Sequence, residues 1–259
     1  MSNIPEVSLP AEKIAEIGPI TLTNSFLAAL IVSLILIVFA LLIRKKIGIV
    51  PSRLQLMLEF VISLFLDNLK AALNNNEKKA RKLLPLFLTI FLFLFIANNF
   101  SLLPLFTSII TEEKTAIFRT PPSHFGLTVA LALGVVVTSH IMALIISPFK
   151  HIGNFIKIMP LLKARSIKDL LNALLEIFLG VLDIVGEIAK VLSLSARLFG
   201  NIFAGEVMVM IITSLAVFTH YIVPMPFIFL SAFSGLVHAF VFPLLALQFM
   251  CGTIRSVQS

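Results

Sequence analysis

The chain has 259 residues, of which 59% are hydrophobic and 13% charged, and its mean hydropathy is +1.07. Soluble domains have about a quarter of their residues charged, so the composition excludes a soluble protein and indicates a polytopic membrane protein. We interpret the net charge of +7 as basic cytoplasmic loops rather than as a nucleic-acid site. The single cysteine, Cys251, excludes an internal disulfide and a cysteine metal cluster, and we expect neither a metal nor another cofactor.

The first half of the chain is predicted to contain two membrane spans and one surface helix. Apolar runs cover residues 24–43 and 83–106, and each reaches the roughly 20 residues that a transmembrane helix needs. Between them, residues 52–73 combine apolar side chains at helical spacing with charged ones. That pattern is typical of an amphipathic helix lying in the membrane interface.

The second half is predicted to be helical as well, which makes the fold class all-α. Residues 124–149 form a further span and a helical hairpin with 83–106. Residues 168–219 are continuously compatible with a helix and contain no proline, and residues 227–251 form the last helix, with Pro243 as a kink. The positive-inside rule places the basic loops in the cytoplasm, the N-terminus outside and the C-terminus in the cytoplasm.

The length of segment 168–219 does not suit an ordinary span. A helix of about 50 residues is about 75 Å long, whereas the hydrocarbon core is about 30 Å thick. Because the predicted orientation allows one crossing here, the helix must be steeply tilted or bent, and Gly200 and Gly205 are candidate positions for a bend. A nearly horizontal helix with a polar stripe implies a protein partner alongside it.

The polar stripe is centred on Arg197. At 100° per residue, five side chains lie within about 80° of it, namely Asp183, Glu187, Lys190, Ser193 and Asn201. Glu206 lies on the opposite face. No acidic residue is three or four positions from Arg197, so its counter-charge must come from elsewhere in the fold or from another subunit. An ionised side chain in mid-membrane costs about 2.5–3.5 kcal/mol on insertion scales, which makes a functional role the default interpretation.

The last helix carries Ser231, Ser234 and His238 on one face. A short turn joins it to segment 168–219, so the two helices should pack antiparallel and bring His238 near Glu206 as a protonatable pair. Packing is the competing interpretation for several of these groups. We expect packing roles for Ser193, Ser195, Ser231 and Ser234. Lys190 can form an ion pair with its acidic neighbours, and His140 is expected to be structural. For His238 a structural role and a functional role are equally compatible with the sequence.

Residues 192–208 read LSLSARLFGNIFAGEVM. This stretch closely resembles the arginine-bearing helix of subunit a of F-type ATP synthases, whose pattern is roughly L-S-L-x-L-R-L-F-G-N-x-x-A-G-E. Three other stretches resemble motifs of that family, namely ANNFSLLP at 97–104, PPSHFGLTVALAL at 121–133 and LVHAFVFPLLAL at 236–247. The resemblance covers essentially the whole chain.

The resemblance implies that the last two helices form a long near-horizontal hairpin packed on a ring of c-subunits. It also implies b-type peripheral-stalk subunits, other ATP synthase subunits and membrane lipid as partners, with the ATP chemistry in other subunits. Arg197 takes the position of the family's arginine, which faces the ring carboxylate between two aqueous half-channels. The family's outer half-channel positions correspond to Asn201, Glu206 and His238, and we add Ser231 to this set. The inner half-channel positions correspond to Asp183, Glu187 and Ser193, and we add Lys190.

The chain departs from the family pattern at three positions: His238 replaces the usual Gln, Ala196 the usual Leu, and Val191 a frequent proline. Mitochondrial members commonly carry His where this chain has Glu206, which favours a bacterial or plastid-type source. We expect a bacterial plasma membrane rather than an organellar inner membrane. Two alternatives stay open, a secondary ion transporter and a membrane scaffold subunit. The sequence shows neither the inverted repeat of a transporter nor a glycine-rich nucleotide loop, and the choice between proton and sodium rests largely with the ring.

Overall fold

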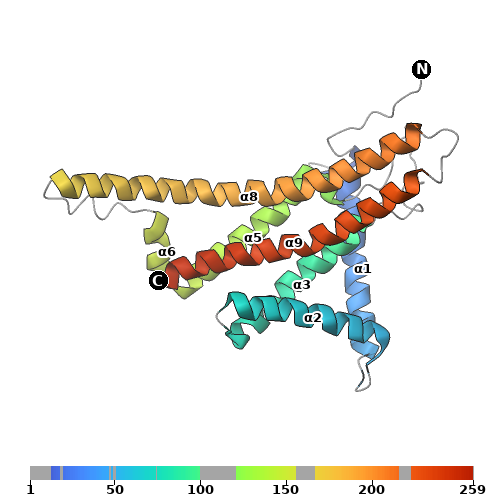
Figure 1. Cartoon of the computed structure of the whole chain (residues 1–259), viewed down its shortest axis with the longest axis horizontal. Helices are drawn as coiled ribbons and strands as arrows, with labels where there is room; N and C mark the ends of the chain where they lie inside the picture. Colours follow the sequence, from blue (N-terminus) through green and yellow to red (C-terminus); the bar gives the residue numbers. More distant parts are fainter. Residues whose placement is uncertain are drawn as a thin grey trace. The chain divides into compact units, whose positions relative to one another are not determined.

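The computed structural model of the protein describes residues 13–17, 20–46, 48, 51–73, 75–99, 121–155, 167–215 and 223–258. These residues are nearly all helical, which confirms the predicted all-α class (Figure 1). The helices are α1 Asn24–Lys46, α2 Arg53–Ala72, α3 Glu77–Asn99, the 3-10 helix η2 Pro121–Ser123, α5 Phe125–Ile146, α6 Pro148–Phe155, α8 Ile167–Leu215 and α9 Pro224–Gln258. Ahead of them, β1 Lys13–Ile17 and β2 Ile20–Thr23 pair antiparallel, with Lys13 opposite Thr23 and Ile17 opposite Ile20. The sequence analysis did not predict this strand pair.

Four helices in the described part of the chain are long and apolar enough to cross a membrane: α1, α3, α5 and α9. The protein is therefore an integral membrane protein. Helix α2 begins where the Ser52 hydroxyl accepts a hydrogen bond from the backbone N–H of Gln55, which satisfies one donor of the first turn. Helix α3 begins at Glu77, earlier than the expected residue 83, because the basic run before its apolar part is helical and Arg81 pairs with Glu77 one turn away at 2.7 Å.

The long segment is one continuous helix. Helix α8 has 49 residues, which corresponds to a length of about 75 Å. Residues 216–219, the end of the predicted segment, and residues 100–106, the end of the predicted span 83–106, lie outside the described residues. Helix α9 continues through Pro243 as far as Gln258.

The chain divides into two compact units, and each is described by itself. The first contains residues 1–128 and 196–244. In it α1 packs on α3 through the buried residues Ala28, Val32 and Ala97. Aromatic rings join two further helices to α3, because Phe65 of α2 lies 5.2 Å from Phe91 of α3 and 5.6 Å from Phe240 of α9, centroid to centroid.

A polar contact fixes α3 against α9 in this first unit. The buried Asn98 side chain donates from Nδ2 to the carbonyl oxygen of Gly235 at 2.8 Å. A Cβ on Gly235 would lie 3.1 Å from Cβ of Asn98, so the missing side chain lets the two helices approach. Small residues at the contact and one interhelical hydrogen bond are the usual means of helix association in membranes.

The second unit contains residues 129–195 and 245–259. Its buried apolar side chains come from α5, α8 and α9 and include Ala132, Val135, Val136, Ala143, Leu194, Met250 and Ile254. Those of α5 are small, which allows close packing in the absence of a hydrophobic drive between helices in lipid.

Candidate functional site

Arg197 lies on α8 with its side chain exposed. On the same turn, Leu198 is 1% exposed and Leu194 is 2% exposed. The apolar side of this turn is therefore packed, whereas the guanidinium of Arg197 is not packed against the described residues. Among the described residues, no hydrogen bond or ion pair to the Arg197 side chain is present. The exposed cation thus needs water or another protein beside it in the membrane.

The N-terminal half of α8 also exposes a large apolar surface. Leu174, Phe178, Leu182, Val185 and Ile188 are each between 45% and 63% exposed. Lipid tolerates such side chains, but it does not tolerate the charged groups that alternate with them on the same helix. The surface is therefore suited to another apolar protein surface that carries a matching polar group.

The outer set of predicted residues lies in the first unit, around His238. Nδ1 of His238 is 2.8 Å from the carbonyl oxygen of Ser234, and Nε2 contacts Nδ2 of Asn201 across to α8. A carbonyl only accepts, so Nδ1 carries the proton. In the neutral ring Nε2 then accepts a hydrogen bond from the Asn201 amide, and protonation of Nε2 requires that amide to turn its oxygen to the ring.

The two other outer residues lie on the same pair of helices. A Cβ on Gly205 would lie 2.9 Å from Oγ of Ser231, so α8 and α9 approach closely here because residue 205 is glycine. Ser231 and Glu206 are both half-buried. The pairing of Glu206 with His238 stays a prediction.

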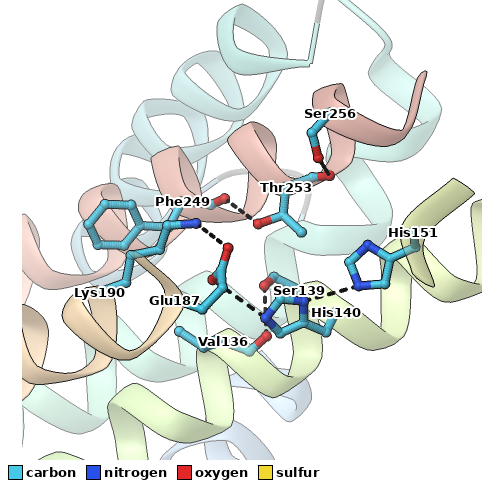
Figure 2. Close-up of polar contacts among 9 residues, drawn as sticks. All are labelled: Val136, Ser139, His140, His151, Glu187, Lys190, Phe249, Thr253 and Ser256. Atoms are coloured by element: carbon cyan, nitrogen blue, oxygen red, sulfur yellow. Dashed lines mark hydrogen bonds and ion pairs between the residues drawn. The ribbon is translucent and has the colours of Figure 1, made fainter. Parts of the chain in front are cut away.

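The inner set lies in the second unit, and Figure 2 shows two of its members, Glu187 and Lys190, in contact. Oε1 of Glu187 is 2.6 Å from Nζ of Lys190, an ion pair one turn apart on α8. Nζ also lies 5.8 Å from the ring centroid of Phe249 on α9, within the range of a cation–π contact. Asp183 and Ser193 are exposed on the same helix.

Two histidines complete this inner cluster, and the sequence analysis gave neither of them a functional role. Nε2 of His140 is 3.4 Å from Oε2 of Glu187, and Nδ1 of His140 is 3.2 Å from Nε2 of His151. The sequence predicts a structural role for His140 and no particular role for His151. On an unbroken helix residues eleven positions apart are about 16 Å apart along the axis, so sequence spacing gave no signal for the pair.

The break between α5 and α6 brings the histidines together. Helix α5 ends at Ile146 and α6 starts at Pro148, whose ring nitrogen cannot donate a helical hydrogen bond. His151, on α6, is buried. Its burial, and secondarily the neighbouring His140, lower the pKa of His151, whereas Glu187 acts in the opposite direction.

Comparisons with known proteins all match the chain to one family. The family described as ATP synthase A chain matches residues 26–251. The chain is 28% identical over 239 residues to ATP synthase subunit a 1 of Hahella chejuensis, covering 92% of this chain and 87% of that protein. It is 30% identical over 243 residues to ATP synthase subunit a of Streptococcus equi subsp. zooepidemicus, covering 91% and 92% of the two chains.

Proposed function

Because this chain belongs to the ATP synthase A chain family, we propose that it is the ion-translocating stator subunit of a rotary ATP synthase. The observation that carries the proposal is Arg197, an exposed cation on a long apolar helix, for which the described residues provide no counter-charge. A carboxylate on a neighbouring ring of c-subunits would supply that charge. The ATP chemistry then takes place in other subunits of the complex.

The mechanism follows from the energetics of a carboxylate in lipid. An ionised carboxylate cannot face the hydrocarbon without a large desolvation penalty. It must therefore take up a proton from one aqueous half-channel before the ring turns it into lipid, and lose the proton to the other half-channel on its return. A charge moving through about 100 mV gains roughly 2.3 kcal/mol, and the ring converts this free energy into rotation.

Arg197 separates the two half-channels in this mechanism. Its positive charge favours the ionised form of the carboxylate as that group passes, and it repels protons that would otherwise cross directly. We assign Asn201, Glu206, Ser231 and His238 to the outer half-channel and Asp183, Glu187, Lys190 and Ser193 to the inner one. The contacts of His238 with Asn201 and of Glu187 with Lys190 support these groupings.

The proposed setting is a bacterial plasma membrane, with the N-terminus outside and the C-terminus in the cytoplasm. The bacterial origin of the chain's relatives supports the assignment to a bacterial membrane, and the basic loops support the orientation. The proposed partners are the c-ring, b-type stalk subunits and the remaining subunits of the complex.

Replacement of Arg197 tests the proposal against a scaffold role and against an independent transporter. ATP synthesis driven by an imposed proton gradient is measured in inverted vesicles carrying Arg197→Ala or Arg197→Gln, and immunoblots confirm that ring and head are present. We expect both variants to assemble and to lose synthesis. Substantial synthesis by Arg197→Gln indicates a scaffold, and ion flux that persists in membranes without the c-ring indicates a transporter.

A further inference from the structure

Resting on the proposed function, we propose that His151 and His140 form a two-imidazole relay that passes protons between the cytoplasmic surface and Glu187 in the inner half-channel. The three side chains come from α6, α5 and α8 and make a continuous line of contacts in the second unit (Figure 2). The relay adds to the half-channel two titratable groups that Glu187 alone would not supply.

The geometry engages both nitrogens of the His140 ring. Nδ1 is 3.2 Å from His151, and Nε2 is 3.4 Å from Oε2 of Glu187. In the neutral state His151 donates a hydrogen bond from Nε2 to Nδ1 of His140, and the proton on Nε2 of His140 then faces Oε2 of Glu187 at 3.4 Å. This second contact is longer than a hydrogen bond, so it has to shorten for the proton to pass. An imidazole with one nitrogen on each partner is the arrangement that proton transfer through a ring requires.

Proton transfer along this line balances without any further reactant. Nδ1 of His151 is buried, so the relay requires a local opening that admits water to this atom from the cytoplasmic side. A proton then binds to Nδ1 of His151, the proton on Nε2 of His151 moves to Nδ1 of His140, and the proton on Nε2 of His140 moves to Oε2 of Glu187. One proton has entered and one has reached the carboxylate, and both rings are neutral in the opposite tautomer. Return of the rings to the first tautomer resets the relay.

The surrounding charges favour holding the mobile proton beside the carboxylate. The titratable and charged groups that contact His140 directly or through Glu187 are His151 from α6 and Glu187 and Lys190 from α8, and α9 contributes the ring of Phe249. Burial lowers the pKa of His151, so that ring is a neutral acceptor near pH 7. The carboxylate of Glu187 beside His140 attracts a proton that enters the line of contacts. Lys190 limits this effect because its ion pair at 2.6 Å already neutralises the carboxylate.

A structural cluster is the competing explanation, because the same contacts connect three helices. The two roles differ in what a glutamine at position 140 achieves. Its amide donates and accepts one hydrogen bond each and so can maintain the contacts, but it cannot carry a proton through. A structural role is thus maintained by His140→Gln, and a relay is not.

The test uses inverted vesicles of the whole complex stripped of the catalytic head, in which the cytoplasmic side faces the medium. Proton flux under a fixed potassium diffusion potential is measured while the medium pH is varied and the internal pH is held constant. We expect His140→Gln and His151→Gln to reduce the flux roughly tenfold or more, as loss of a positioned proton carrier does. We also expect both to flatten the dependence of flux on medium pH between about 5 and 8.

Chemical rescue gives a readout that a structural role would not move. Imidazole added to the medium should restore flux to His140→Ala but not alter the wild type. His124→Gln is the matched control, since the same substitution just before α5 lies outside the cluster, and it should leave the pH profile unchanged. The relay would be overturned if His140→Gln had the flux and pH profile of the wild type. It would also be overturned if imidazole failed to restore flux to His140→Ala at normal subunit levels. Those outcomes leave the proposed function intact, which only the Arg197 variants test.

Discussion

Arg197 remains a cation in an apolar setting because of its own chemistry. A guanidinium keeps its proton throughout the accessible pH range, whereas a lysine ammonium loses its proton readily on burial. The planar fork also offers two parallel hydrogen bonds to a carboxylate, which an ammonium does not. The identity of this residue therefore matters as well as its charge.

Arg197→Lys should consequently fail nearly as completely as Arg197→Ala. We expect a loss of proton-driven ATP synthesis of at least roughly a hundredfold, in line with removal of a preorganised electrostatic group. The measurement is synthesis in inverted vesicles at pH 7 and pH 6. Near-normal synthesis by the lysine variant at either pH would show that positive charge alone is sufficient.

His238 places an imidazole in the outer set, at a position where the family usually has Gln. Protonation of its Nε2 disturbs the contact with Asn201, because both atoms would then be donors. We expect His238→Gln to maintain synthesis and to weaken its dependence on the outer pH between about 5 and 8. The test is ATP synthesis in inverted vesicles with the internal pH varied.

Ser234→Ala is the control for the His238 variant. It removes a hydroxyl 3.4 Å from Nδ1 but leaves the carbonyl that Nδ1 contacts at 2.8 Å, so its pH profile should match the wild type. Equal pH dependence in wild type and His238→Gln would remove the histidine from the titrating path.

Among the elements, the contact of α3 with α9 depends on Gly235. A methyl group there would meet Cβ of Asn98 at 3.1 Å and backbone atoms of the same residue at 3.7 and 3.8 Å. We expect Gly235→Ala to destabilise the protein by about 1–3 kcal/mol, as overpacking does. The measurement is the thermal inactivation midpoint of the detergent-solubilised complex.

Gly134→Ala is the matched substitution on α5, where an added Cβ meets nothing within 4 Å. Because alanine is the better helix former by about 0.8–1.0 kcal/mol, this variant should be as stable as the wild type or more stable. A lower midpoint for Gly134→Ala than for Gly235→Ala would contradict the packing argument.

The elements differ in how far the sequence predicts them. Helix α8 was predictable at nearly its full length, because residues 168–219 combine helical periodicity with an absence of proline. The strand pair β1–β2 was not predicted, although β2 alternates apolar and polar residues, because strands of five and four residues are too short to give a clear periodic signal. The start of α3 at Glu77 was not predicted, because charged residues ahead of an apolar run are typical of a solvent-exposed loop.

The candidate site divides in the same way. Arg197 could be identified from its cost in an apolar helix and from the motif around it. The Lys190–Glu187 pair follows from helical spacing. The contact of His140 with His151 depends on the direction in which the chain turns after Ile146, and no spacing rule encodes that direction.

At the scale of the whole molecule, the basic loops predict the orientation. Lys78→Cys on α3 should react with a membrane-impermeant thiol reagent from the cytoplasmic side, and Lys114→Cys from the outside. Position 114 lies outside the described residues and is chosen from the sequence. The native Cys251 is 5% exposed, so it should contribute little background. Labelling of both positions from the same side would contradict the orientation.

The central claim is that Arg197 forces protons to travel on the ring rather than directly between half-channels. The most direct measurement is passive proton conductance in head-stripped vesicles whose ring is immobilised by a cross-link to the stator, with wild type and Arg197→Ala compared at equal subunit levels. We predict no conductance in the cross-linked wild type, because the ring cannot carry protons, and a persistent leak in cross-linked Arg197→Ala, because the barrier is gone. Conductance in the cross-linked wild type, or an equally tight membrane in cross-linked Arg197→Ala, would contradict the account.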